Sequence, residues 1–184
     1  MQKIAVGVLE LSSIAKGIES MDVMLKASKI NIIISKTVCP GKYIIVIGGD
    51  AGAVNEAMEK GAESAGKYAL NKLVLPAVHK NVLPALNGKK QNAIYGKPIG
   101  IVEFSSITSG ILACDAALKS ANVKILEFKI GMLIGGKSYF IISGDTSSLQ
   151  EAFHAVNKKV DKRRIINSVI ISSPDNDLIK HLFG

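Results

Sequence analysis

The sequence is short of aromatic and acidic residues, and it lacks any long uninterrupted apolar run. Aromatic residues make up 5% of its 184 positions and tryptophan is absent, whereas 48% of positions are apolar, so small and aliphatic side chains must build the core. No apolar stretch approaches the roughly 20 residues that a membrane-spanning helix needs. The mean hydropathy of +0.30 therefore predicts apolar surface that is buried against other subunits.

Cysteine is also scarce. The chain has only Cys39 and Cys114, which are too few for a disulfide framework and form no Cys-x-x-Cys pair. The first residues contain neither a long apolar segment nor a small-residue cleavage site, so no secretory signal is expected. These absences favour a cytoplasmic protein.

A tandem duplication organises the chain. Residues 7–36 align with residues 100–129 at a constant offset of 93, and 12 of these 30 positions are identical. The offset then becomes 95 and later 96, with two extra residues in the second copy between Lys129 and Asp145. The alignment predicts a first domain at 1–88, a linker at 89–97 and a second domain at 98–184.

Both copies predict the same order of elements. In the first copy, alternating β-rich segments indicate strands at 6–11, 30–38, 43–47 and 73–78. Helices are expected at 14–28, at 53–68 and, as a short terminal helix, at 81–86, with Ser12-Ser13 and Asp50 supplying the N-caps. The order βαββαβ plus a helix, repeated twice, predicts an α+β fold with helices on one face of a mostly antiparallel sheet.

The motifs of both copies resemble the shell domain of bacterial microcompartments. They share a strand ending in Ser-Ser, a helix with Asp-x-x-Leu-Lys, a hairpin with a glycine-bearing turn, and Gly-Asp before an alanine-bearing helix. The chain resembles the tandem-domain shell proteins, and residues 9–17 and 35–42 are similar to the iron–sulfur type from propanediol-utilisation compartments. The resemblance implies a homotrimeric, pseudohexagonal tile that lies among other shell proteins and has no enzymatic activity.

The resemblance places the turn between the second and third strands at the central pore. Cys39 lies in this turn in the first copy and has no cysteine counterpart in the second. A three-fold axis would bring three copies of Cys39 together, enough for three of the four iron corners of a [4Fe–4S] cluster. The remaining pore-turn residues would be Pro40, Gly41, Met132, Leu133, Ile134, Gly135 and Gly136.

The cluster would suit electron transfer across the shell, with an encapsulated redox enzyme as a further partner. The alternative is a tile with an open pore for small metabolites, in which Cys39 only lines the pore. A duplicated enzyme and a basic nucleic-acid binder are further hypotheses, but no nucleophile and base can be assembled from the motifs. Neither nucleic acid nor a membrane is an expected partner.

Lys26 and Lys119 lie late in the first helix of each copy. On the residues alone, each is a solvated helical lysine. The resemblance implies a second role, because the shell-domain lysine at this position contacts the neighbouring tile. Its stem can cover apolar surface while its ammonium donates to backbone carbonyls.

The other polar features are interpreted as structural. Paired carboxylates that recur in both copies favour a scaffold role over acid–base chemistry; they are Glu10, Glu103, Asp22 and Asp115. The histidines lack metal-site spacing, and Cys114 is expected to be a buried core thiol. The strongest basic cluster favours a solvated helix end over nucleic-acid binding because it has no interleaved aromatic residues; it consists of Lys158, Lys159, Lys162, Arg163 and Arg164.

Overall fold

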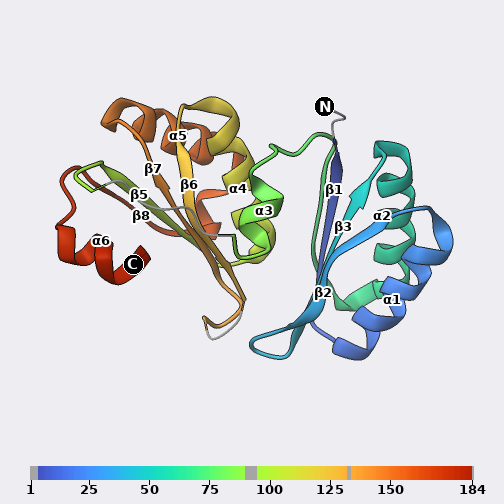
Figure 1. Cartoon of the computed structure of the whole chain (residues 1–184). Coiled ribbons are helices and arrows are strands. Elements are labelled where there is room, and N and C mark those ends of the chain that lie inside the picture. The colour runs from blue at the N-terminus through green and yellow to red at the C-terminus, as the bar shows by residue number, and fades with distance from the viewer. Residues whose placement is uncertain (1–3, 90–94, 132–133, 184) are drawn as a thin grey trace. The chain divides into compact units, whose positions relative to one another are not determined.

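The computed structural model describes residues 4–89, 95–131 and 134–183. The chain divides into two compact units, Met1–Val78 and His79–Gly184. Each unit contains a four-stranded antiparallel sheet (Figure 1).

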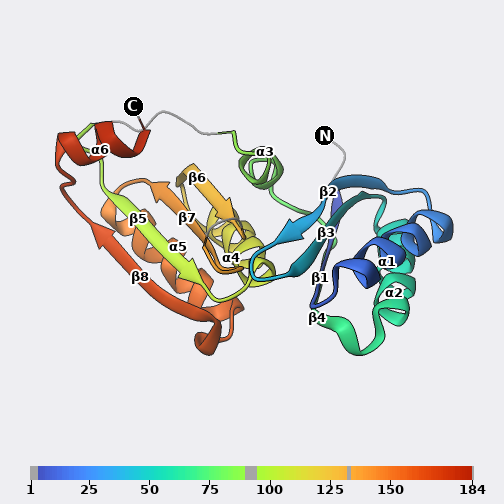
Figure 2. The same cartoon turned by 90° about the horizontal axis from the view of Figure 1, so that it is seen from below.

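The first unit has helices on one face of its sheet (Figure 2). Its strands pair in the order β2-β3-β1-β4. A Cβ atom on Gly7 of the central strand would lie 2.5 Å from Met58 Cγ, so glycine is what allows the helix to lie this close. The elements are β1 (Ala5–Leu11), α1 (Ile14–Ala27), β2 (Asn31–Val38), β3 (Lys42–Gly49), α2 (Ala51–Ala65), η1 (Gly66–Tyr68) and β4 (Ala69–Leu75).

The second unit repeats this arrangement with the strand order β6-β7-β5-β8. Two helices, α4 and α5, cover one face of the sheet (Figure 1). Ile179 of the terminal helix α6 packs in a cluster with Ile99, Leu126 and Ile141. The elements are α3 (Val82–Leu86), β5 (Ile99–Phe104), α4 (Ile107–Ser120), β6 (Lys124–Ile130), β7 (Ser138–Ser143), α5 (Thr146–Lys159), η2 (Lys162–Arg164), β8 (Ile165–Ile171) and α6 (Asn176–Phe183).

The strand registers reproduce the sequence offsets. Gly7 pairs with Ile47 in the first unit and Gly100 pairs with Ile142 in the second, so the offset grows from 93 to 95 between the paired strands. The central strand of each unit also has a register shift at the same place, after Glu10 and after Glu103. The expected α+β class with two βαββαβ domains is confirmed.

Two element boundaries differ from those expected. The last strand of the first unit is Ala69–Leu75 rather than 73–78, because Pro76 has no N–H to donate and ends the ladder. The second helix begins at Ala51, where the Asp50 side chain accepts a hydrogen bond from the Gly52 N–H (2.9 Å). It ends at Ala65, before Gly66 with its positive φ of 52°.

The division between the units also differs from the one expected at residue 88. It falls after Val78, and α3 belongs to the second unit, where it packs against α4 and β6. Val82, Ala85 and Leu86 are buried, so the apolar face of α3 serves the second unit although the repeat assigns this helix to the first. Residues 90–94 of the expected linker lie outside the described residues.

Candidate functional site

Cys39 lies in the tight turn that joins β2 to β3. Val38 pairs with Lys42, so only Cys39, Pro40 and Gly41 lie between the two strands. All three are exposed, the Cys39–Pro40 peptide is cis, and Gly41 has a positive φ of 75°. Cys39 is a free cysteine, and its thiol is therefore presented to solvent at one end of the sheet.

The matching turn of the second unit joins β6 to β7 and is longer. The Gly131 N–H donates to the Lys137 carbonyl (2.9 Å), and the Lys137 N–H donates to the Ile134 carbonyl (3.2 Å). Gly131, Gly135 and Gly136 all have positive φ, between 64° and 74°. Met132 and Leu133, which were expected to line the pore, lie outside the described residues.

Both turns lie at the same end of their sheets. Leu11 at the end of β1 pairs with Tyr43 just after the first turn, and Phe104 at the end of β5 pairs with Ser138 just after the second. The repeat therefore presents Cys39 and the glycine-rich turn Ile134–Gly136 at equivalent positions, although only the first turn carries a thiol.

One chain supplies a single exposed cysteine side chain. Among the residues that the structure describes, no group of three or more His, Cys, Asp or Glu side chains is arranged to hold a metal ion. Cys114 is buried on α4, where desolvation and the nearby Asp115 raise its thiol pKa well above the usual value. Cys39 thus suits an iron–sulfur cluster only if several copies of the chain share it.

The two helix-end lysines make the same ion pair in different surroundings. Lys26 Nζ lies 2.6 Å from Asp22 Oδ2, and both side chains are mostly exposed. Lys119 Nζ also lies 2.6 Å from its aspartate, but Asp115 is only 6% exposed and also accepts a hydrogen bond from the His79 N–H (2.7 Å). The sequence could not show this link, because His79 lies outside the repeat's aligned motifs.

Asp22, Asp115 and Glu103 each pair with a lysine of their own unit, which fits the interpretation of the recurring carboxylates as scaffold. Lys137 Nζ donates to Glu103 Oε1 (3.0 Å). A buried carboxylate that the residue patterns did not single out is Glu127, which accepts from the Tyr139 hydroxyl (3.1 Å). Its position on β6 belongs to no motif that would have indicated it.

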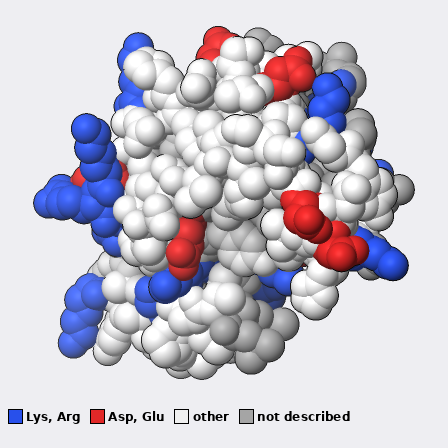
Figure 3. Space-filling model, turned by 90° about the vertical axis from the view of Figure 1, so that its left-hand side faces the viewer, with Lys and Arg blue, Asp and Glu red and all other residues white. Residues whose placement is uncertain are grey.

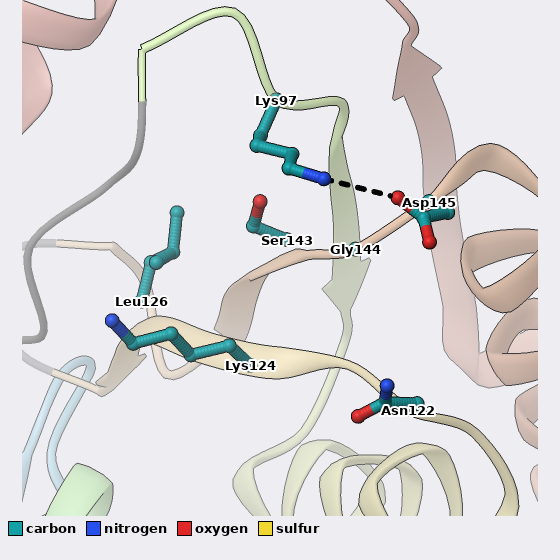
Figure 4. Close-up of a pocket in the computed structure, with 7 residues that line it drawn as sticks. All are labelled: Lys97, Asn122, Lys124, Leu126, Ser143, Gly144 and Asp145. Carbon is teal, nitrogen blue, oxygen red and sulfur yellow. Dashed lines mark hydrogen bonds and ion pairs between the residues drawn. The ribbon is translucent and has the colours of Figure 1, made fainter.

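A small pocket lies at the start of α5 in the second unit (Figure 4). Its volume is 160 Å³, and its Lys97 ammonium pairs with Asp145 (3.2 Å) while the Lys124 ammonium lies on the side away from that carboxylate. The Ser143 hydroxyl donates to the Pro98 carbonyl (2.9 Å). The polar groups of this pocket are thus largely satisfied by the protein itself.

No helix among the described residues is long and apolar enough to cross a membrane. Two sheets of the same topology, each with a turn at the same end, define a tandem repeat of one α+β domain. The family model of the BMC domain matches residues 5–78 and 98–174, and the chain belongs to this family of microcompartment shell proteins.

Individual relatives agree with this assignment. The chain is 37% identical to the bacterial microcompartment shell protein PduT of Citrobacter freundii over 97% of both chains. The crystal structure of a microcompartment protein from Desulfitobacterium hafniense DCB superposes with a TM-score of 0.87 at 38% identity, covering 97% of this chain and 99% of that one. The fused permuted hexameric shell protein of the RMM microcompartment shares the fold, with a TM-score of 0.66 at 20% identity over 85% and 83% of the two chains.

The protein is therefore a structural component of a microcompartment shell rather than an enzyme. As a BMC-domain protein it belongs with the proteins that build microcompartment shells.

Proposed function

We infer that this chain forms a homotrimeric tile in which three copies of Cys39 hold a [4Fe–4S] cluster at the central pore. The observation that supports the trimer is a difference between the two units in the solvent exposure of equivalent apolar side chains. Four apolar residues are identical at equivalent positions, yet they are exposed in the first unit and buried in the second.

The exposed set lies on α1 and β2. Its members are 39–57% exposed, whereas their counterparts on α4 and β6 are at most 6% exposed. So large a cluster of exposed aliphatic side chains is typical of a surface that another protein covers. The four pairs are Ile14/Ile107, Ile18/Ile111, Leu25/Leu118 and Ile32/Ile125.

In the second unit a further helix packs against α4 and β6, whereas the described part of the first unit has no such helix against α1 and β2. Helix α3 ends the first repeat in sequence and packs against α4 and β6. Its counterpart at the end of the second repeat is α6, whose Leu178 is exposed while the matching Val82 of α3 is buried. Ile166 and Val169 of the edge strand β8 are exposed as well.

These complementary surfaces support a head-to-tail contact between copies of the chain. The β8–α6 side of one copy would cover the α1–β2 side of the next, as one repeat follows another. Such a heterologous contact joins two different surfaces. It forms a closed ring when the rotation that relates one copy to the next is a whole fraction of a full turn. Six shell repeats make a pseudohexagon, and three chains of two repeats close it.

A three-fold axis near the β2–β3 turn gives the exposed thiol of Cys39 its partners. Three thiolates fill three corners of the cluster, and the fourth iron takes another ligand. The cluster would supply one-electron transfer between the two faces of the tile. Cys39 would bind it, Pro40 and Gly41 would fix the turn, and Ile134, Gly135 and Gly136 would complete the pore lining.

Lys26 and Lys119 are proposed to contact neighbouring tiles. Both ammonium groups lie at the last turn of an outer helix and remain partly exposed despite their ion pairs. The partners of the trimer would be other shell proteins and, on the side of the compartment's contents, a redox enzyme.

The test is iron and acid-labile sulfide in protein purified without oxygen. We expect about four iron and four sulfide per three chains, absent from Cys39→Ser and retained in the control Cys114→Ala. Both variants should keep the trimer. If the unaltered chain binds no iron even after reconstitution, the cluster is refuted and an open metabolite pore becomes the better function.

A further inference from the structure

The second unit carries a dense group of cations that the first unit lacks. The basic patch consists of Lys158, Lys159, Lys162, Arg163 and Arg164, all exposed. Figure 3 shows lysine and arginine side chains gathered along the left margin of the face that it presents. The counterparts in the first unit carry no net charge; they are Glu63, Ser64, Gly66, Lys67 and Tyr68.

The fold itself does not require these cations. Lys158 and Lys159 lie in the last turn of α5, where positive charge complements the helix dipole. Helix α2, the equivalent of α5, has no basic residue in its last turn and is nevertheless a regular helix of 15 residues. The same scaffold thus forms without the patch, which leaves its charge to be explained by something outside the fold.

Part of the patch is held in place and part is available. The Arg163 guanidinium donates to both carboxylate oxygens of Asp161, at 2.7 to 3.2 Å, and these hydrogen bonds lower the pKa of Asp161 to about 2. Lys158, Lys159 and Lys162 make no ion pair with any residue in the described part of the chain. Three exposed ammonium groups therefore lie on the same α5–η2 segment as a fixed arginine–carboxylate pair.

The patch lies at the end of the sheet that carries the β6–β7 turn. The Ser105 N–H donates to the Arg164 carbonyl (2.9 Å), and Phe104 pairs with Ile165 at the start of β8 and with Ser138 after the turn. Within this unit the cations are thus at the pore end, a position that rests on the proposed trimer. Their density and exposure do not depend on it.

We propose that the basic patch is a docking surface for a protein partner with a carboxylate-rich surface. Lysine and arginine donors pair well with carboxylates, and charge complementarity steers such encounters. Nucleic acid fits less well, because the patch has no aromatic side chain on which bases could stack. A 310 Å³ hollow beside the patch has mixed donors and acceptors, from Ser105, Asp161, Arg163 and Arg164, and suits polar protein groups.

The experiment measures the binding of a labelled oligoglutamate peptide to the intact protein by fluorescence anisotropy, with a DNA duplex of equal charge as comparison. The patch variant is Lys158→Gln/Lys159→Gln/Lys162→Gln. The control, with the same net charge, is Lys29→Gln/Lys80→Gln/Lys89→Gln, which removes three exposed lysines outside the patch. All six lysines are exposed, so both variants should fold.

We expect the patch variant to bind oligoglutamate about tenfold more weakly and the control no more than about twofold more weakly. Equal losses in the two variants would show that net charge alone attracts the peptide and would overturn the proposal. Tighter binding of DNA than of oligoglutamate, lost only in the patch variant, would overturn it in favour of nucleic acid. Iron content and trimer mass are measured separately, so failure of the proposed cluster leaves this result interpretable.

Discussion

Helices α1 and α4 carry the same motif in different environments. Ile18 of α1 and Ile111 of α4 occupy the same position within the repeat, but the first is exposed and the second is fully buried. The repeat thus determines which side chains of the helix are apolar. Whether those side chains are buried depends on which other segment of the chain packs against them. Here α3 packs against α4, and no helix of the described first unit plays that part for α1.

A negative charge placed at each of these two positions in turn should have the largest and most different effects. Ile111→Asp buries a carboxylate in an apolar site and should cost about 4 kcal/mol or more, enough to prevent stable folding. Ile18→Asp should leave each chain folded but convert the trimer to monomers. Thermal unfolding and light scattering after gel filtration measure the two effects.

Loss of the trimer in Ile18→Asp is the outcome that the proposed head-to-tail contact requires. A trimer of normal mass in Ile18→Asp would show that the exposed face of α1 is not the contact. Ile18→Val, which keeps the face apolar, is the matched control and should remain trimeric.

The ion pairs at the helix ends should also differ between the two units, with smaller losses of stability. Lys119→Ala takes the ammonium partner from the buried Asp115, which keeps its hydrogen bond from the His79 N–H, and should cost about 1–2 kcal/mol in the free energy of unfolding. Lys26→Ala removes an exposed pair and should cost less than about 0.5 kcal/mol. Urea unfolding midpoints measure both.

The same two variants also test the proposed role at the tile edge. If both lysines contact neighbouring tiles, both variants should form fewer sheets with other shell proteins, although only one is less stable. Equal stability losses would contradict the difference in burial, and normal sheets from the double variant would contradict the edge role.

The fold could be predicted from the sequence because the same local patterns occur in both copies of the repeat. The Ser13 and Ser106 N-caps, the strand registers and the offsets all agree between copies, so each local pattern supports the other. The exposed position of Cys39 in its turn also reflects local signals, since Pro40 and Gly41 favour a turn.

Long-range packing is what the sequence could not show. Val82 and Leu86 look like the end of the first domain, and only the folded chain reveals that α3 packs against α4 and β6. The hydrogen bond from the His79 N–H to Asp115 joins residues 36 positions apart and involves a backbone donor, which leaves no trace in the residue pattern. The exposure of Ile18 could not be predicted from the sequence either, because the equivalent residue of the second repeat, Ile111, is a core residue.

The smallest effect concerns pH and again separates the two units. Burial lowers the pKa of His79 below its usual 6.5, and the opposing attraction of Asp115 does not outweigh it. The unfolded chain therefore binds a proton at this site more readily than the folded one, so stability falls as pH drops below about 6.5. The first unit contains no histidine, so its stability has no such contribution.

The measurement is the unfolding midpoint in urea at about pH 7.5 and at about pH 5.5, on either side of the usual histidine pKa. His79→Gln should reduce the loss of stability on acidification, because the backbone N–H that donates to Asp115 is retained while the titrating ring is removed. The exposed His154→Gln is the control for losing an imidazole elsewhere in the same unit. An unchanged pH profile in His79→Gln would show that another group causes the acid sensitivity, and the link between His79 and α4 would then be structural only.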